Sequence, residues 1–251
     1  MEKSLQKIKN YMDTELVSET DLNKMAKLMV VYNNWIEANE LDAVAFRCWD
    51  SLQESLGINP CLVMSLFSNN LIPSACESDV MGALSMLALQ EASKSPSGLV
   101  DWNNNYGKDP EKAVLFHCGN FPKNIYKCSG KDCPSVNYPP ILASTLGQEN
   151  TYGTIDGHLK AGPITFARLS TNDEDGTIKA YLAEGEITSD ELDTFGSWGV
   201  VKVNKLQKLM SYICQQGFEH HVAINLAQVK NILDEAFSKY MGWDVYNHEA
   251  N

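Results

Sequence analysis

Short apolar runs separated by turn residues fill the chain from residue 98 onward, and this pattern constrains the fold most strongly. The turns are rich in Gly, Asn and Asp, which favour chain reversals. Short strands at such spacing are typical of an antiparallel sheet or barrel. Two predicted helices, at about 204–216 and 226–241, close the chain. The apolar runs are GLVDW, AVLFHCG, TYGTIDGHL, GPITFARLS, TIKAYLAEG and GVVKV.

The N-terminal part has a different pattern, in which helical and strand-like segments alternate. Residues 19–38 are predicted to form a helix, because Ser18 begins a capping-box pattern and apolar residues then repeat at helical spacing. The runs LDAVAFR (41–47) and CLVMSLF (61–67) are short and apolar, and we expect both to be buried strands. Residues 77–92 have one apolar face and are predicted to form a second helix. This order indicates a partial parallel α/β layer.

The composition changes near residue 94, at the linker-like cluster KSPSG. We therefore expect a partial α/β domain over residues 1–93 and a β-rich, barrel-like domain with closing helices over residues 94–251. The predicted fold class is α/β plus β. A layer of only two strands with exposed edges is marginally stable. We expect the chain to associate in solution for that reason.

The net charge of −12 over 251 residues limits the expected partners. An acidic surface repels phosphate backbones and anionic lipids, so we expect neither nucleic acid nor membrane as a partner. An excess of carboxylates does suit a divalent cation. No apolar run approaches the ~20 residues of a membrane span, and the charged N-terminus lacks the apolar core of a signal peptide.

The seven cysteines are an odd number in a chain too large to depend on disulfides. They favour free thiols in a reducing compartment, and we expect a cytoplasmic protein. Cys128 and Cys133 form a C-x4-C pair in a polar loop. No second pair follows, so we interpret them as two free thiols rather than as half of a zinc site.

Three positions combine ionisable side chains with predicted chain reversals. Glu77 and Asp79 follow a proline turn and begin a helix, where sites cluster in open α/β sheets, although both could simply complement the helix dipole. Asp101 ends an apolar run and, taken alone, fits the start of the NNNYG turn. His220 and His221 enter a strand-like run, so we expect at most one of them to face a given site. Spacing alone thus indicates two carboxylates and a histidine that can share a cation.

Known sequence motifs of several enzyme classes are missing. The chain has no nucleophile elbow, P-loop, dinucleotide fingerprint or H-E-x-x-H motif.

Five segments in one order are more specific than the single residues. They are AFRCWDSLQESLGINPCLVMSLFSNNLIPSACESDVMGALSMLAL, GLVDWNNNY, LFHCGNFP, GPITFARLS and GFEHHVAI. This series resembles the C-terminal half of the L-fucose isomerase family, which includes relatives of arabinose isomerase. The resemblance extends from about residue 20 to residue 245.

The resemblance implies a set of site residues. In that family a Glu at a helix start, an Asp one segment later and a His near the C-terminus bind Mn²⁺, with Mg²⁺ or another divalent cation as alternatives. By motif position these residues are Glu77, Asp101 and His220, and Glu77 and Asp101 are also the acid/base pair. His220 is taken rather than His221 because it holds the matching place after the glycine of GFEHH. Residues expected to line the sugar site are Trp49, His117 and Arg168.

The function implied by the resemblance is metal-dependent interconversion of an aldose and a ketose through an ene-diolate. Family members are longer and form hexamers, so this chain is expected to be a catalytic C-terminal half that works in a homo-oligomer with an N-terminal half. One alternative is a non-catalytic carbohydrate- or metal-binding module. Another is a different metal-dependent reaction on a sugar, such as epimerisation or aldol cleavage, because an ene-diolate serves those reactions too.

Overall fold

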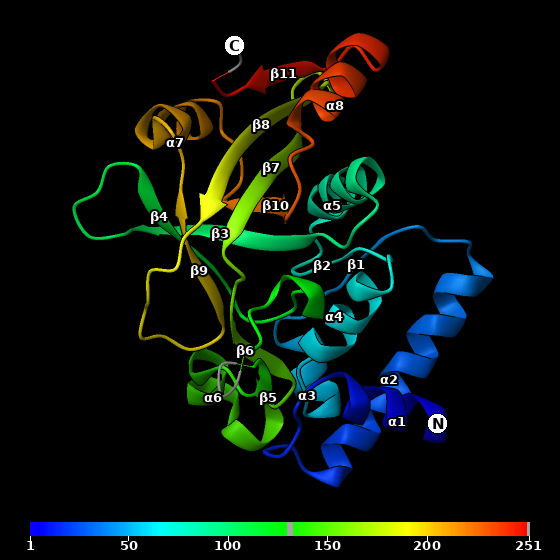
Figure 1. Cartoon of the computed structure of the whole chain (residues 1–251). Coiled ribbons are helices and arrows are strands. Elements are labelled where there is room, and N and C mark those ends of the chain that lie inside the picture. The colour runs from blue at the N-terminus through cyan, green and yellow to red at the C-terminus, as the bar shows by residue number, and fades with distance from the viewer. Residues whose placement is uncertain (130–132, 250–251) are drawn as a thin grey trace.

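A nine-stranded, mostly antiparallel sheet is the largest element of the computed structural model, which describes residues 1–129 and 133–249 (Figure 1). The strand order is β11-β8-β7-β10-β3-β4-β9-β6-β5. The predicted antiparallel sheet is therefore confirmed. The strands are β3 (Gly98–Asn105), β4 (Lys112–His117), β5 (Ser135–Asn137), β6 (Thr154–His158), β7 (Gly162–Thr171), β8 (Ile178–Ile187), β9 (Ser197–Lys202), β10 (His221–Asn225) and β11 (Asp244–Asn247).

Six of these strands form a closed ring, because β8 pairs with β9 as well as with β7. The closing contact is short and joins Glu186 to Lys202 and Ile187 to Val201. In contrast, β7 and β8 pair along their whole length. The sheet is thus a ring and not a barrel, which corrects the barrel-like expectation.

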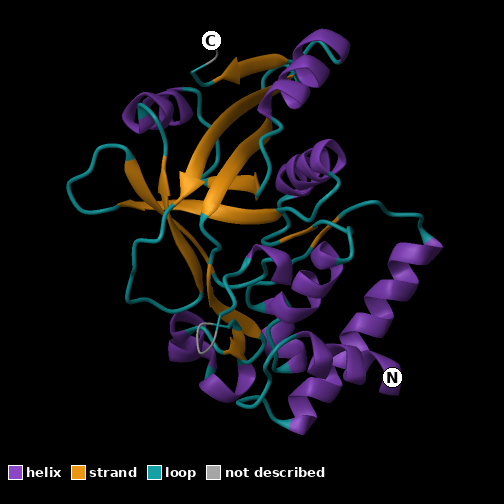
Figure 2. Cartoon of the chain, viewed as in Figure 1, coloured by secondary structure: helices purple, strands orange, loops and turns teal. Residues whose placement is uncertain are grey.

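Helices surround a much smaller sheet in the N-terminal part (Figure 2). Strands β1 (Val44–Ala45) and β2 (Ser74–Ala75) pair in parallel, as predicted for an α/β layer. The predicted helix at 19–38 is confirmed, and the Ser18 side chain accepts a hydrogen bond from the Asp21 N–H at its start. The helices are α1 (Glu2–Tyr11), α2 (Glu19–Ala38), α3 (Ser51–Leu56), α4 (Cys61–Asn69) and α5 (Val80–Ser93).

The run CLVMSLF is helical, so the prediction of a strand at 61–67 is wrong. It forms most of α4, in which every residue from Cys61 to Ser68 is buried. A segment buried on all sides has no amphipathic period, and periodicity then cannot separate a helix from a strand. The second parallel strand is β2, which follows α4, and the run at 41–47 contributes only β1.

The closing helices are present, at slightly different positions from those predicted. They are α7 (Leu206–Gln215), α8 (Lys230–Asp234) and a π-helical turn (Glu235–Tyr240) that continues α8. Shorter pieces precede them in the chain: α6 (Pro140–Leu146) and two 3₁₀ turns (Lys123–Ile125 and Gln148–Asn150).

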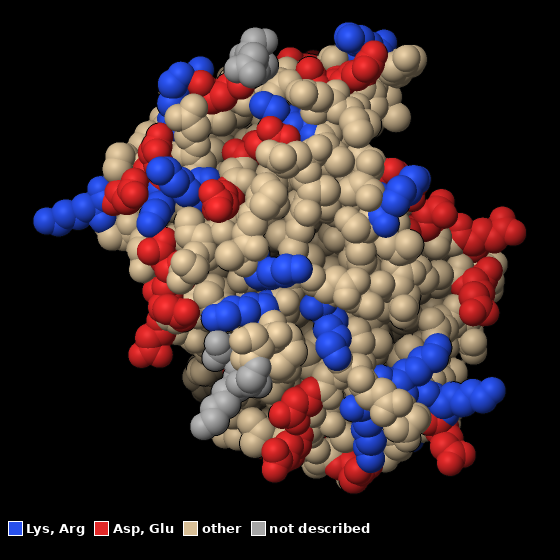
Figure 3. All heavy atoms as spheres, viewed as in Figure 1, with Lys and Arg blue, Asp and Glu red and all other residues tan. Residues whose placement is uncertain are grey.

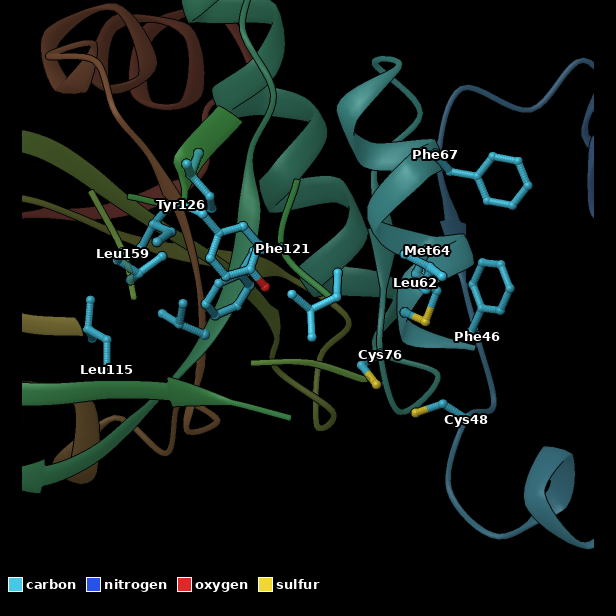
Figure 4. Close-up of a cluster of buried hydrophobic side chains, with 14 of the residues drawn as sticks. Phe46, Cys48, Leu62, Met64, Phe67, Cys76, Leu115, Phe121, Tyr126 and Leu159 are labelled. Carbon is cyan, nitrogen blue, oxygen red and sulfur yellow. The ribbon is translucent and has the colours of Figure 1, made fainter. Parts of the chain in front are cut away.

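Buried side chains connect the N-terminal helices with the large sheet in one apolar cluster. Figure 4 shows Phe46 and Phe67 on the α4 side, and Phe121 and Leu159 on the sheet side, of this cluster. A second cluster lies where α5 and α8 pack on β7, β8 and β10. Burial of this kind contributes roughly 25 cal/mol per Å² of apolar area. The start of α5 is thereby fixed against the sheet.

One cysteine pair differs from the expectation of free thiols. Cys128 and Cys133 form a disulfide. The other five cysteines are free, as expected: Cys48, Cys61, Cys76, Cys118 and Cys214.

Charged side chains of both signs are spread over the visible face (Figure 3). Across residues 1–129 and 133–249, no helix combines the length and the apolar character needed to span a membrane.

Candidate metal centre

Asp101 and His221 lie opposite each other on neighbouring antiparallel strands, β3 and β10. Cross-strand partners project their side chains to the same face of a sheet. The Nε2 atom of His221 is 3.3 Å from Oδ1 of Asp101 and 3.9 Å from Oε2 of Glu77. The fold therefore brings together two carboxylates that lie 24 positions apart in sequence and a histidine from near the C-terminus.

Glu77 lies in the short segment between β2 and α5, in an unusual backbone conformation. Both Glu77 and Ser78 have positive φ, +57° and +58°. Backbone hydrogen bonds hold this segment: the Ser78 N–H donates to the Phe46 carbonyl (2.8 Å), and the Glu77 N–H donates to Sγ of Cys48 (3.2 Å). The Glu77 side chain is 37% exposed, so it reaches the site from the solvent side.

Asp79 fixes the orientation of His221. Its Oδ2 is 3.0 Å from Nδ1 of His221, and its Oδ1 accepts the Gly82 N–H at 2.7 Å as the N-cap of α5. Burial raises the pKa of Asp79, but hydrogen bonds from His221 and Arg168 hold it well below its usual range. Asp79 is therefore an ionised acceptor, which puts the imidazole proton on Nδ1. The Nε2 lone pair of His221 then faces Glu77 and Asp101.

Arg168 supports Asp79 from behind and does not line the cavity. It is 1% exposed, and its Nη1 and Nη2 atoms are 2.5 Å from Asp79 and 3.2 Å from Glu219. Burial lowers the pKa of this guanidinium, but the two carboxylates raise it by more than burial lowers it. The pKa is therefore above its usual value and the side chain stays charged. Arg168 was expected to line the sugar site, but the structure places it against Asp79 and Glu219.

Two atoms at the centre have no hydrogen-bond partner within the described part of the chain. They are the buried Oδ1 of Asp101 and the buried Nε2 of His221. Unpaired buried acceptors are unfavourable unless something satisfies them. A cation beside Glu77 would do so, because carboxylate oxygen and imidazole nitrogen are ordinary ligands of Mn²⁺ and related metals. The residues thus fit a divalent cation.

His220, the histidine predicted from motif position, lies at the rim. Its side chain is 66% exposed, and its Nε2 is 3.6 Å from Oδ1 of Asp101. Asp101, His220 and His221 still offer ligand atoms within 4.8 Å of one another. The expectation that only one of the two histidines approaches the site therefore does not hold, and the more buried of the pair is His221.

His117 and Trp49, both expected to line the sugar site, line a cavity beside Glu77 and Asp101. His117 is buried at the end of β4, and its Nδ1 accepts the Cys118 N–H at 2.9 Å. Its Nε2 has no hydrogen-bond partner among the described residues, and a ligand atom of His117 lies within 4.8 Å of those of Glu77 and His221. The remaining lining residues are Phe116, Cys118, Pro139, Ile141, Leu142 and Phe195.

Sequence reasoning missed two participants. Asp79 was interpreted only as a possible partner of the helix dipole, and His221 was set aside in favour of His220. The sequence signal for Asp79 was its position directly before the helical run that begins at Val80, as expected of an N-cap. No signal in the sequence showed that its second oxygen meets a histidine 142 positions away.

The family is established by comparison. A family model described as the L-fucose isomerase C-terminal domain matches residues 115–249, and this chain belongs to that family. The resemblance noted from the sequence is confirmed.

Several curated relatives are named sulfoquinovose isomerase. A sulfoquinovose isomerase of Priestia aryabhattai is 27% identical over 156 residues, which cover 61% of this chain and 32% of that protein. A sulfoquinovose isomerase of a Clostridium species (strain MSTE9) is 43% identical over 93 residues, which cover 37% of this chain and 21% of that protein. A sulfoquinovose isomerase of Alkalicoccus urumqiensis is 26% identical over 151 residues, which cover 60% of this chain and 32% of that protein. The matched region spans about a third or less of each of these relatives.

Proposed function

We propose that this chain carries the catalytic, cation-binding part of a metal-dependent aldose–ketose isomerase. The observation that supports this most directly is the convergence of Glu77, Asp101 and the Nε2 atom of His221. Membership of the L-fucose isomerase C-terminal family supports the reaction type. Three relatives named sulfoquinovose isomerase agree with sugar isomerisation.

The ligand set that we propose is Glu77, Asp101 and His221, with His220 as the alternative histidine. His221 is favoured because its Nδ1 bonds to Asp79 and its Nε2 is unpaired among the described residues. Histidines that bind metals usually donate their other N–H to a carboxylate in this way. Hard oxygen ligands with one imidazole suit Mn²⁺ or Mg²⁺ better than a structural Zn²⁺.

The carboxylates of Glu77 and Asp101 suit the proton transfer between C1 and C2 of a sugar. Glu77 approaches from a solvent-exposed loop and Asp101 from the sheet, so a sugar between them meets a carboxylate from each element. A positioned acid/base pair typically contributes ~10²–10⁴ in rate. The bound cation would act as a Lewis acid that stabilises negative charge on O1 and O2.

His117 and Trp49 are proposed to hold the sugar. Because Nδ1 of His117 accepts the Cys118 N–H, its neutral form carries the proton on Nε2 and donates a hydrogen bond toward the cavity. Trp49 is 40% exposed, and its ring can cover an apolar face of the sugar. Arg168 is proposed as a positioning residue that acts through Asp79.

For the substrate and the assembly, we propose a class of sugar and a type of oligomer. The substrate is a monosaccharide aldose, and sulfoquinovose joins fucose and arabinose as a candidate because relatives carry that name. We propose that the active form is a cytoplasmic homo-oligomer, hexameric by family resemblance, in which a further N-terminal half completes the sugar site. The five free cysteines support the cytoplasmic location, whereas the Cys128–Cys133 disulfide does not.

The decisive experiment follows deuterium from solvent into C1 of the ketose while candidate aldoses convert to ketoses, with Mn²⁺ present. Wild-type chain, supplied with an N-terminal half when inactive alone, is expected to give ketose with deuterium incorporated. The variants Glu77→Gln and Asp101→Asn are expected to lose turnover. Full turnover in either variant contradicts the proposed acid/base pair. Stoichiometric Mn²⁺ binding without any turnover would favour the alternative of a non-catalytic binding module.

A further inference from the structure

Four buried or half-buried cysteines form a group beside the cavity, and the proposed isomerase reaction does not use them. They come from separate segments: Cys48 follows β1, Cys61 begins α4, Cys76 follows β2 and Cys118 follows β4. Figure 4 shows the side chains of Cys48 and Cys76 turned toward each other. The Sγ atoms of Cys61 and Cys118 are 3.9 Å apart.

Cys118 is the common neighbour within this group. Its Sγ lies 3.4 Å from Nδ1 of His117. Ligand atoms of Cys76, His117 and Cys118 all lie within 4.8 Å of one another. Two thiols and an imidazole nitrogen from two different segments thus surround one point.

The spacing matches the ligand sphere of a tetrahedral thiophilic cation. Zinc–sulfur bonds of ~2.3 Å and zinc–nitrogen bonds of ~2.0–2.1 Å place sulfur atoms about 3.8 Å apart and sulfur about 3.5 Å from nitrogen. The Sγ atom of Cys118 is 3.9 Å from Sγ of Cys61 and 3.4 Å from Nδ1 of His117. Cys76 lies within 4.8 Å of both Cys118 and His117, whereas Cys61 is outside that group and has to move toward the ion to act as a donor.

We propose that Cys76, Cys118 and His117 form a second cation site, selective for a thiophilic ion such as Zn²⁺ or Cd²⁺, with Cys61 as a fourth donor. Three thiolates and one imidazole are a common ligand set for zinc. Thiolate ligands select soft metals, whereas Glu77 and Asp101 select hard ones. The two sites are thus separated by ligand chemistry, although they are close in space.

His117 connects the two sites and is the weakest donor of the set. Its Nδ1 already accepts the Cys118 N–H, and this hydrogen bond must be exchanged for the cation. Cys118 and His117 line the cavity, which gives an ion a path from solvent. An ion bound there fixes the His117 ring, the residue proposed above to hold the sugar.

Cadmium titration of the full chain tests this site directly, because thiolate-to-cadmium charge transfer gives an ultraviolet absorption band. Wild-type chain is expected to develop the band with one ion per chain. Cys76→Ser and Cys118→Ser are each expected to weaken cadmium binding at least about tenfold. The band should persist in Glu77→Gln, which separates this site from the proposed catalytic cation.

Two control variants address the other cysteines of the chain. Cys214→Ser removes the exposed free thiol, and the pair Cys128→Ser with Cys133→Ser removes the disulfide. Both are expected to retain the band. Its loss in either control, or its absence from the wild-type chain, would overturn the proposal and leave the four cysteines as small apolar residues of the core.

A folding defect in Cys118→Ser does not end the test. His117→Gln leaves every thiol in place and removes only the nitrogen donor, so it should weaken cadmium binding while the circular dichroism spectrum stays unchanged. Unaltered affinity in a folded His117→Gln protein contradicts the ligand set. Glu77→Gln is expected to lose Mn²⁺ binding and to keep the cadmium band. Mn²⁺ binding in this variant tests the proposed catalytic cation, and the cadmium band tests the cysteine site.

Discussion

The side chain of His221 shows how a single residue is prepared for a site. Its ring is held on one side by Asp79, and the opposite nitrogen is left without a partner among the described residues. His220 is adjacent in the chain but lies at the rim, largely exposed. The contrast between these two neighbours is suitable for a direct test.

His221→Ala is expected to abolish Mn²⁺ binding, whereas His220→Ala should change the affinity by no more than a few-fold. The physical reason is that, of these two histidines, His221 presents a buried nitrogen beside Glu77 and Asp101 that has no hydrogen-bond partner among the described residues. Calorimetric titration of the two variants beside the wild-type chain measures this. The reverse result would restore His220, the ligand predicted from motif position.

Residue positions were predictable from the sequence only in part. Glu77 and Asp101 were identified because motif order placed them, and the structure brings them together, although their role stays a prediction. His220 was chosen over His221 for its place after the glycine of GFEHH, whereas the histidine that meets Asp101 is set by the pairing of β10 with β3. That pairing joins segments about 120 residues apart, and no local pattern encodes it.

Asp79→Asn is expected to weaken Mn²⁺ binding by about 10–100-fold, because the carboxylate that orients His221 loses its charge. Asn is also a good N-cap, so α5 should persist. Calorimetry and circular dichroism measure the two effects. Asp193→Asn, an exposed position, is the control. Unchanged affinity in Asp79→Asn would mean that Asp79 only caps the helix.

Helix α5 is the element that connects packing to the site. It packs on β7 and β10, and its N-cap is Asp79. Its glycine, Gly82, has no room for a side chain: an added Cβ would meet Oδ2 of Asp79 and Cδ1 of Leu99, the latter at 3.0 Å. The helix thus has a glycine where propensity alone favours alanine.

Gly82→Ala is therefore expected to destabilise the protein and to weaken Mn²⁺ binding, although helix propensity predicts a gain of about 1 kcal/mol. The added methyl group displaces the Asp79 carboxylate from His221. Thermal unfolding and calorimetry together measure this, with Val80→Ala in the same turn as an exposed control. A higher melting temperature with unchanged affinity would show that Asp79 can move at little cost.

Elements were predicted well where an amphipathic period or a cap was present, as in α2 and α5. The error at α4 arose because every residue from Cys61 to Ser68 is buried, so the sequence there has no polar face. The short strands β1 and β2 were equally hard to place, since each contains only two residues. Ring closure through β8 and β9 depends on tertiary contacts alone.

For the whole molecule, the proposed cation connects three distant segments of the chain. Glu77, Asp101 and His221 come from the β2–α5 segment, β3 and β10. An ion that binds only when these segments are assembled stabilises the folded state by mass action, by about 2.7 kcal/mol at a hundredfold excess over Kd.

Mn²⁺ at that excess is expected to raise the melting temperature of the wild-type chain by roughly 5–10 °C, given ~2–4 °C per kcal/mol for a chain of this size. A chelator should reverse the shift, and Glu77→Gln should show none. Differential scanning calorimetry measures all three conditions. Equal shifts in wild type and Glu77→Gln would place the stabilising ion elsewhere.

Association in solution is the second expectation at this scale. The small parallel sheet of β1 and β2 has two strands of two residues each, and such a sheet is marginal by itself. Light scattering of the chain is expected to show a species larger than a monomer. A well-folded monomer over a wide concentration range would contradict this expectation.

The left-handed backbone at Glu77 and Ser78 implies that the folded protein would be more stable if glycine replaced Glu77, although the proposed cation site would then lose a ligand. A side chain in that conformation costs of the order of 1–3 kcal/mol, and glycine avoids the penalty. Selection for stability alone would therefore replace Glu77 with glycine, whereas selection for a carboxylate facing His221 retains it. A library of this chain sorted only for thermal tolerance should accumulate glycine at position 77, and one sorted for activity should not.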